Sequence, residues 1–133
     1  MQENHLFEYA VIRIVPRVER EEFLNIGVIL YCRQFQFLET LFTIDEDRLY
    51  AFSGYLDMAA LKEHLCVFEK ICKGDEAGGE IAKLDLASRF RWLTAARSTI
   101  VQTSKVHPGL CNDAMETLNR LHTQLVLEPE NDQ

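Results

Sequence analysis

The strongest constraint on the fold is residues 26–32 (IGVILYC), a segment of strand length that contains no charged side chain. A strand that is apolar on both faces must be covered on both sides, so this segment is predicted as a central strand of a sheet. Residues 7–15, which stop at Pro16, and residues 35–44 are rich in β-branched and aromatic residues and are predicted as two further strands. Only two residues separate the second segment from the third, which predicts a hairpin.

Helix-starting signals follow these strands. Asp45 precedes a short helical segment that extends through Phe52, and Asp57 precedes a longer one, because the short acceptor side chain of aspartate suits the position before a helix. Near the C-terminus, Asp113 and Glu116 have the spacing of a capping box and predict a final helix. After Asp57, apolar residues recur with the spacing of one helical face: Leu61, Leu65, Phe68 and Cys72.

The remaining segments complete a single α+β domain over residues 1–133. Residues 73–85 include a polar, glycine-rich stretch and are predicted as a mobile loop, residues 86–93 as a short helix, residues 98–104 as a fourth strand and residues 106–109 (VHPG) as a turn. Residues 128–133 are predicted as a flexible tail. This order of elements favours a mainly antiparallel sheet of about four strands, with the helices packed mostly on one face. The order of the strands within the sheet does not follow from the sequence.

Net charge and hydropathy limit the classes of partner. The chain of 133 residues has a formal net charge of −7, and phosphate binding relies on cationic surface, which argues against nucleic acid as the general partner. The N-terminus lacks the pattern of a signal peptide, and no apolar run reaches the roughly 18 residues needed to span a bilayer. We therefore expect a cytoplasmic protein that is not inserted in a membrane.

Positive charge is nevertheless concentrated in one part of the sequence. Residues 86–112 contain no acidic residue, and arginine offers a fixed set of donors that matches phosphate or carboxylate. This segment is therefore a candidate anion site or a docking surface for an acidic partner. The alternative is that its cations neutralise the protein's own acidic helices. The basic residues are Arg89, Arg91, Arg97 and Lys105, and His107 adds a further group that can be protonated.

Arg13 interrupts the apolar pattern of the first strand. An unpaired buried charge is costly, so Arg13 is expected to have a carboxylate partner, which Glu19, Glu21 or Glu22 could supply. If Arg13 lies on an open face of the sheet instead, it would join the basic cluster. Gly27, in the predicted central strand, indicates a bulge or a close approach of two backbones.

The motifs of common catalytic and cofactor sites are missing from the sequence. The histidine and cysteine pairs, His107 with Cys111 and His64 with Cys66, do not have the spacing of a zinc site. No G-x-S-x-G elbow surrounds a serine, and there is no glycine-rich phosphate loop. We predict no metal and no cofactor, and the sequence does not decide whether the protein is an enzyme.

Two blocks of the sequence carry a family resemblance. In the first, Tyr9, Arg13 and Pro16 form a Tyr-x-x-x-Arg-x-x-Pro strand, and an Arg-x-Glu-x-x-Asn-x-Gly-Val segment follows: Arg20, Glu22, Asn25, Gly27 and Val28. The second block comprises residues 89–110 and precedes an aspartate-led helix at Asp113. Together the two blocks resemble the bacterial domain-of-unknown-function family numbered 3037, and the resemblance covers nearly the whole chain.

The resemblance implies a short bacterial protein whose activity is not established. It also implies an association with HipA-like kinase-fold proteins, whose genes lie beside members of this family. Our first hypothesis is therefore a non-enzymatic accessory protein that binds such a partner. The second is a small enzyme or sensor that binds a phosphorylated ligand or a nucleic-acid end, and the third is a subunit of a homo-oligomer.

The candidate site residues are mostly those at which the family motif and the charge pattern coincide. In the second hypothesis Glu22 or His107 would act as acid or base, and all the side chains would have to converge on one cleft. The anion would be held by Arg13, Arg20, Asn25, Arg89, Arg91 and His107.

Overall fold

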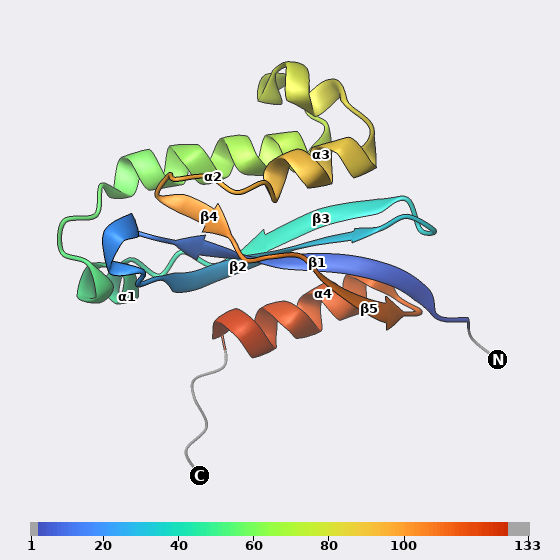
Figure 1. The fold of residues 1–133 in the computed structure, drawn as a ribbon, viewed down its shortest axis with the longest axis horizontal. Helices are drawn as coiled ribbons and strands as arrows, with labels where there is room; N and C mark the ends of the chain where they lie inside the picture. Colours follow the sequence, from blue (N-terminus) through green and yellow to red (C-terminus); the bar gives the residue numbers. More distant parts are fainter. Residues whose placement is uncertain (1–2, 128–133) are drawn as a thin grey trace, which may run out of the picture.

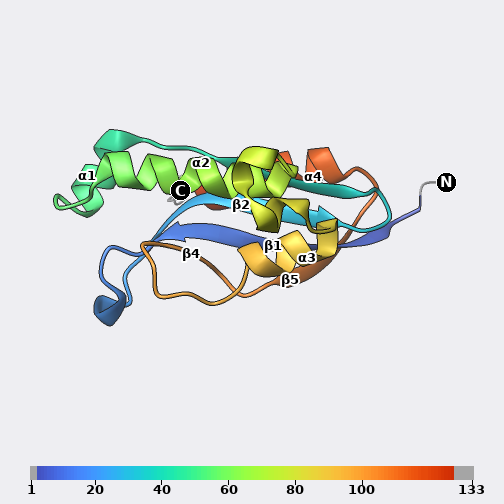
Figure 2. The ribbon, with the colours of Figure 1, turned by 90° about the horizontal axis from the view of Figure 1, so that it is seen from above.

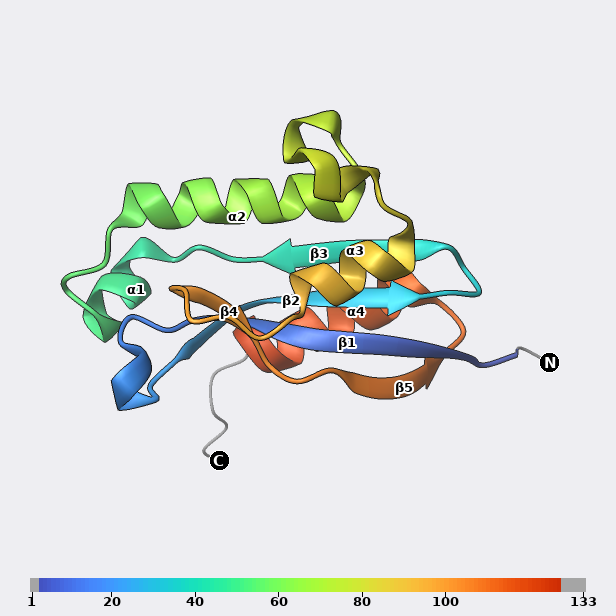
Figure 3. The same cartoon turned by 45° about the horizontal axis from the view of Figure 1, so that its top comes forward.

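The fold is built on a five-stranded antiparallel sheet, as a computed structural model that describes residues 3–127 shows (Figure 1). β1 (His5–Ile14), β2 (Leu24–Cys32) and β3 (Phe37–Phe42) pair in the order β3-β2-β1. Two short strands, β4 (Val101–Thr103) and β5 (His107–Cys111), pair one after the other with the free side of β1, as Figure 3 shows. The predicted hairpin of the second and third strands is confirmed by the β2–β3 pairing.

Helices cover both faces of this sheet. α2 (Met58–Lys73) and α3 (Leu86–Leu93) lie on one face, α4 (Ala114–His122) lies on the other, and the short α1 (Glu46–Phe52) connects β3 to α2 (Figure 1). Every residue of β2 from Ile26 to Cys32 is buried, as the prediction of a central strand requires. The core under α2 and α3 includes Ala10, Ile12, Ile29, Tyr31, Leu65 and Phe90, and the core under α4 includes Phe7, Val28, Leu30, Leu118 and Leu121.

The predicted fold class, a single α+β domain with an antiparallel sheet, is confirmed. The sheet has one strand more than the four expected, because residues 106–109, predicted as a turn, belong mostly to β5. The turn prediction was wrong because Pro108 lies on an edge strand of the sheet. An edge strand tolerates proline, since the N–H that proline lacks would not be needed for pairing with a neighbouring strand. α4 also covers the face of the sheet opposite α2 and α3, although the helices were expected mostly on one face.

Aspartate caps begin each of the four α-helices found within residues 3–127. The carboxylates of Asp45, Asp57 and Asp113 accept hydrogen bonds from the backbone N–H three residues later, at 3.2, 3.1 and 3.0 Å, as the sequence predicts. Asp85 does the same for α3, at 3.2 Å. Such a bond satisfies one of the four backbone donors that a helix start leaves free, and it typically stabilises the helix by about 1 kcal/mol.

The β1–β2 pair contains a bulge next to Gly27. Ile12 lies opposite Gly27 but Arg13 lies opposite Asn25, so Ile26 has no partner on β1. The bulge turns the Ile26 side chain into the core under α2, where it is buried. A bulge or close approach was predicted from Gly27, and the structure contains both, because a Cβ atom on Gly27 would meet the backbone oxygen of Leu41 at 2.6 Å.

Four short helical segments complete the described chain. η1 (Val18–Arg20) lies between β1 and β2, while η2 (Glu76–Gly78) and η3 (Glu80–Lys83) fill the segment between α2 and α3. The mobility predicted for residues 73–85 is not measured by the structure and stays a prediction. A π-helical turn, η4 (Thr123–Leu127), follows α4, and the predicted tail 128–133 lies outside the described residues. Within residues 3–127 no helix is long and apolar enough to cross a bilayer.

We expect Gly27→Ala to destabilise the protein by about 1–3 kcal/mol, because the added methyl group would press on Leu41 and Phe42 of β3. Urea unfolding followed by circular dichroism measures the change. Gly54→Ala is the matched control, since no atom lies within 4 Å of its added Cβ. Equal losses of stability in the two variants would contradict the close approach of β2 and β3.

Candidate functional site

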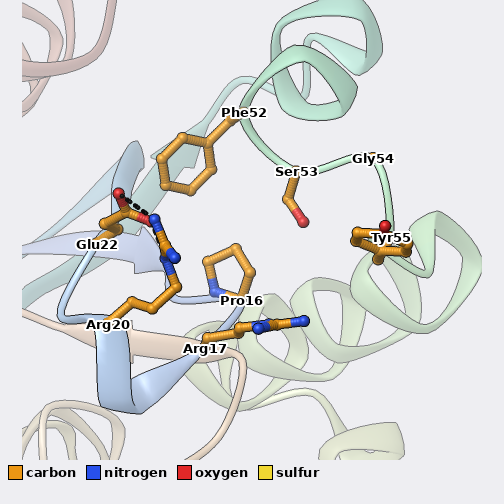
Figure 4. Close-up of a pocket in the computed structure, with 8 residues that line it drawn as sticks. All are labelled: Pro16, Arg17, Arg20, Glu22, Phe52, Ser53, Gly54 and Tyr55. Carbon is orange, nitrogen blue, oxygen red and sulfur yellow. Dashed lines mark hydrogen bonds and ion pairs between the residues drawn. The ribbon is translucent and has the colours of Figure 1, made fainter.

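A hollow of about 320 Å³ lies where the β1–β2 connection meets the connection between α1 and α2 (Figure 4). Residues of the first family block form one wall, and residues of a segment that we did not single out form the other. The hollow is lined by Pro16, Arg17, Arg20, Glu22, Phe52, Ser53, Gly54 and Tyr55. We call it the Tyr55 hollow.

Arg20 and Glu22 form a bidentate ion pair in the first wall. Nε of Arg20 donates to Oε1 of Glu22 at 2.7 Å, and Nη2 donates to Oε2 at 3.2 Å. The hydrogen bonds and the positive charge of Arg20 lower the pKa of the Glu22 carboxyl, and the same contacts raise the pKa of Arg20. Glu22 is therefore held ionised, and a carboxylate whose pKa is lowered is poorly suited to act as a general acid or base at neutral pH.

Tyr55 and Arg17 contribute polar side-chain groups that form no hydrogen bond or ion pair with other residues of the described range. Tyr55 is 93% exposed, the largest fraction among the exposed large apolar side chains of residues 3–127. Arg17 is exposed, and within that range it forms no ion pair and no side-chain hydrogen bond. In Figure 4 its side chain extends from the β1–β2 connection toward the connection that carries Ser53 and Tyr55. An aromatic ring, an unpaired guanidinium and a hydroxyl thus border one hollow.

Arg13 and Asn25 lie side by side on β1 and β2, on the side of the sheet that α4 covers. The Asn25 amide donates to the carbonyl of Leu125 in η4 at 3.3 Å, whereas its Oδ1 is buried without a partner among residues 3–127. The Arg13 guanidinium stacks on the ring of Phe23 at 3.9 Å, and its Nε is buried and also lacks a partner in that range. Burial lowers the pKa of Arg13.

The prediction that a carboxylate pairs with Arg13 was wrong. Among the described residues no acidic side chain forms an ion pair with it, because Glu22 pairs with Arg20 and η1 turns Glu19 and Glu21 outward, where both are exposed. The Phe23 ring takes the place of the carboxylate, and a cation over an aromatic ring is stabilised without a counter-charge.

The other three predicted site residues lie elsewhere. Arg89 of α3 donates to the Leu84 carbonyl at 2.6 Å, beside Gly74 at the end of α2. Arg91 lies 3.7 Å from the Glu8 carboxylate, and the His107 ring packs against Tyr9 with ring centres 5.4 Å apart. The structure therefore brings together Arg20 with Glu22 and Arg13 with Asn25, and it does not bring all six predicted anion ligands into one cleft.

Sequence reasoning missed half of the Tyr55 hollow. Tyr55 follows Gly54 in a connection and lies outside the apolar stripe that starts at Leu61, so a large aromatic residue at a loop position was the available signal. Arg17 follows Pro16 directly but is not a family-motif position. Their proximity depends on β1 and α1 ending at the same end of the sheet, and the sequence pattern does not reveal this arrangement.

The comparison with protein families supports one assignment. A family described as protein of unknown function (DUF3037) matches residues 9–126, which is most of the chain. The chain belongs to this family. No curated protein and no solved structure matches this DUF3037 protein. Within its described residues, no three histidine, cysteine or acidic side chains gather as a metal site requires.

We expect Arg20→Gln to raise the pKa of Glu22, because the variant loses the ionic hydrogen bonds that favour the carboxylate. In the wild-type protein the ion pair is present at neutral pH and is lost as the pH falls through the lowered pKa of Glu22. An NMR titration of the Glu22 carboxyl carbon measures both effects. Arg33→Gln, an exposed arginine in the β2–β3 turn, is the control, and a Glu22 pKa that is the same in both variants would contradict the pair.

We expect Arg13→Met to change the free energy of unfolding by less than about 1 kcal/mol, because methionine keeps the apolar stem and removes a charge that has no carboxylate partner in the described part of the chain. Arg89→Met should cost more, roughly 1.5–3 kcal/mol, since it removes a charged hydrogen bond to a carbonyl. Urea unfolding compares the two. A loss of several kcal/mol in Arg13→Met would show that Arg13 has a structural role that its contacts do not explain.

Proposed function

We propose that this DUF3037 protein is a non-enzymatic accessory protein that binds another protein through the Tyr55 hollow. We further propose that its partner is a HipA-like kinase-fold protein. The choice of this partner rests on the family resemblance alone, whereas the choice of surface rests on the structure. Binding through this hollow would bring the family-motif residues Pro16, Arg20 and Glu22 into the interface.

The observation that carries the proposal is the exposure of Tyr55 beside Arg17. Tyrosine and arginine are enriched among the residues that dominate binding energy in protein interfaces. Burying a side chain of this size is worth roughly 1.5–3 kcal/mol, which the free protein does not gain at Tyr55. Val18 and Phe23, in and after η1, are further exposed apolar residues of the β1–β2 connection, at 48% and 45%.

Local contacts in the first wall support the same proposal. The bidentate contact between Arg20 and Glu22 joins two residues of the connection after η1. Glu21, at the end of η1, adopts a φ of 55°, a left-handed conformation that reverses the chain into β2. A surface that is already ordered in the free protein loses less conformational entropy when a partner binds.

The second hypothesis, an enzyme or sensor that binds a phosphorylated ligand, stays a prediction with less support. Of its six anion ligands only Arg20 lines the Tyr55 hollow, and Glu22 already occupies two of its donors. The third hypothesis, a homo-oligomer that forms through an open sheet edge, meets an obstacle on β5. Pro108 removes a backbone donor from that edge, and proline on an edge strand discourages pairing with a further strand.

The proposal is tested by co-expressing the tagged protein with a HipA-like kinase-fold protein from the same genome and measuring the amount that co-purifies. We expect the wild-type protein to retain the partner and Tyr55→Ala to reduce the affinity about thirtyfold, which is the effect of losing about 2 kcal/mol at an interface centre. Arg17→Ala should also reduce the affinity, and more strongly at low salt than at high salt.

Two control variants test whether a loss of binding is specific to residues of the hollow. Tyr50→Ala removes a tyrosine on α1 that is exposed but does not line the hollow, and Arg33→Ala removes an exposed arginine in the β2–β3 turn. Both should bind as the wild-type protein does. If the kinase-fold protein does not co-purify, the proposed partner is wrong, and if Tyr55→Ala binds as well as Tyr50→Ala, the proposed surface is wrong.

A further inference from the structure

A second hollow lies between α2, the end of α3 and β4, and it shares no residue with the Tyr55 hollow. Its volume is about 70 Å³. One water molecule needs roughly 10–15 Å³ by this measure, so the hollow admits a group of several heavy atoms, about the size of a branched aliphatic side chain. We call it the Trp92 hollow, and it is lined by His64, Val67, Phe68, Ile71, Trp92, Leu93, Arg97, Val101, Gln102 and Thr103.

The Trp92 hollow has an apolar floor. Phe68, Ile71, Leu93 and Val101 are buried core residues, and each presents part of its side chain to the hollow. At the rim, Val67 is 43% exposed and Trp92 is 40% exposed. An apolar group that enters the hollow would therefore contact hydrocarbon below and a tryptophan ring beside it, and burial of apolar surface would favour its binding.

Arg97 provides the charged part of the rim. Its guanidinium lies over the Trp92 ring at 4.1 Å, and it donates to the backbone carbonyls of Trp92 and Leu93 at the end of α3. These two bonds use two of its five N–H groups. No carboxylate among residues 3–127 forms an ion pair with Arg97, and burial lowers its pKa.

The surroundings of Arg97 favour an anionic partner. Figure 2 shows α3, β4 and β5 along the same long side of the molecule, and these elements belong to residues 86–112, which contain four basic residues and no acidic one. On α2, Glu63 and Lys70 flank Val67 at helical spacing. Their charges have opposite signs, so together they add little net charge at the rim. The pKa of His64 is lowered by burial and by the charge of Arg97, so the imidazole is neutral at pH 7. His64 therefore neither attracts nor repels an anion bound at Arg97.

We propose that the Trp92 hollow binds an acidic peptide segment, with one branched aliphatic side chain inserted between Trp92 and Val67 and a flanking carboxylate on Arg97. The floor selects the aliphatic group and the guanidinium selects the anion. The site is separate from the Tyr55 hollow, so the proposal does not depend on the proposed function.

Trp92 is the only tryptophan of the chain, and it therefore reports on this site by its own fluorescence. The probe is a blocked pentapeptide with a central leucine and two aspartates on each side. We expect a saturable change in Trp92 emission, a weaker affinity at high salt, and an affinity at least about tenfold lower for the same peptide with serine in place of leucine. A peptide with lysines in place of the aspartates should not bind.

Two variants locate the binding. Arg97→Gln should weaken binding of the leucine peptide at least about tenfold, since the carboxylate loses its cation. Val67→Phe should also weaken it, because the larger ring at an exposed rim position would close the mouth of the hollow. Circular dichroism shows whether each variant is folded, and Val67→Phe gives the result if Arg97→Gln does not fold. Arg17→Gln, in the Tyr55 hollow, is the control and should bind as the wild-type protein does.

The proposal is overturned by any of three results. The leucine and serine peptides could bind equally, which would show a charge effect without an aliphatic site. Val67→Phe and wild type could bind equally, which would place the peptide elsewhere. Finally, the leucine peptide could leave Trp92 emission unchanged up to millimolar concentration, which would show that the hollow does not take such a segment.

Discussion

The burial of β2 on both of its faces is the constraint on which the structure depends. Val28 and Leu30 point to α4, while Ile29 and Tyr31 point to α2 and α3, and all four are buried. A sheet with such a central strand is stable only when helices cover both faces, because either face left open would expose a row of large apolar side chains to water. The C-terminal helix is therefore as necessary as α2, although the two are far apart in sequence. With both faces covered, exposed sites form where connections meet at the rim of the sheet, as in the Tyr55 hollow, or where covering helices meet an edge strand, as in the Trp92 hollow.

The bulge in β2 illustrates how this constraint shapes the surface. An uninterrupted β1–β2 register would place each successive residue on alternate faces, and a shift of one residue exchanges the faces. By leaving Ile26 unpaired, the bulge directs Ile26 into the core under α2 and sets Asn25 beside Arg13 on the side covered by α4. The polar pair is then next to η4, where Asn25 binds the Leu125 carbonyl. Bulges commonly redirect a side chain in this way.

The sequence predicted the parts of the fold that depend on local pattern. The three N-terminal strands, the aspartate caps at Asp45, Asp57 and Asp113, and the short helix α3 follow from alternation, spacing and hydrogen-bonding capacity over a few residues. β5 was missed because Pro108 and Gly109 are turn residues by propensity, and only their pairing with Glu8 and Phe7 makes them a strand. Gly109 is needed there because the Phe7 ring lies over it, 2.5 Å from where a Cβ would be. The Tyr55 hollow depends on two connections that meet in space, and a one-dimensional pattern does not contain that information.

Arg13 and Arg97 have similar surroundings in an acidic chain, and of the two only Arg97 lines a hollow. The sequence has 21 acidic and 14 basic residues, so carboxylates are not scarce. Nevertheless Arg13 and Arg97 are both partly buried, both have a lowered pKa, and both lie on an aromatic ring, Phe23 or Trp92, without an ion pair among the described residues. The ring stabilises each cation, and an anion supplied by another molecule would offset more of the cost of desolvating it. The arginines that are paired, Arg20 and Arg91, are exposed and gain little from their partners. Arg97 lines a hollow and has no ion pair among residues 3–127, which is the reason for placing the carboxylate of the proposed peptide there.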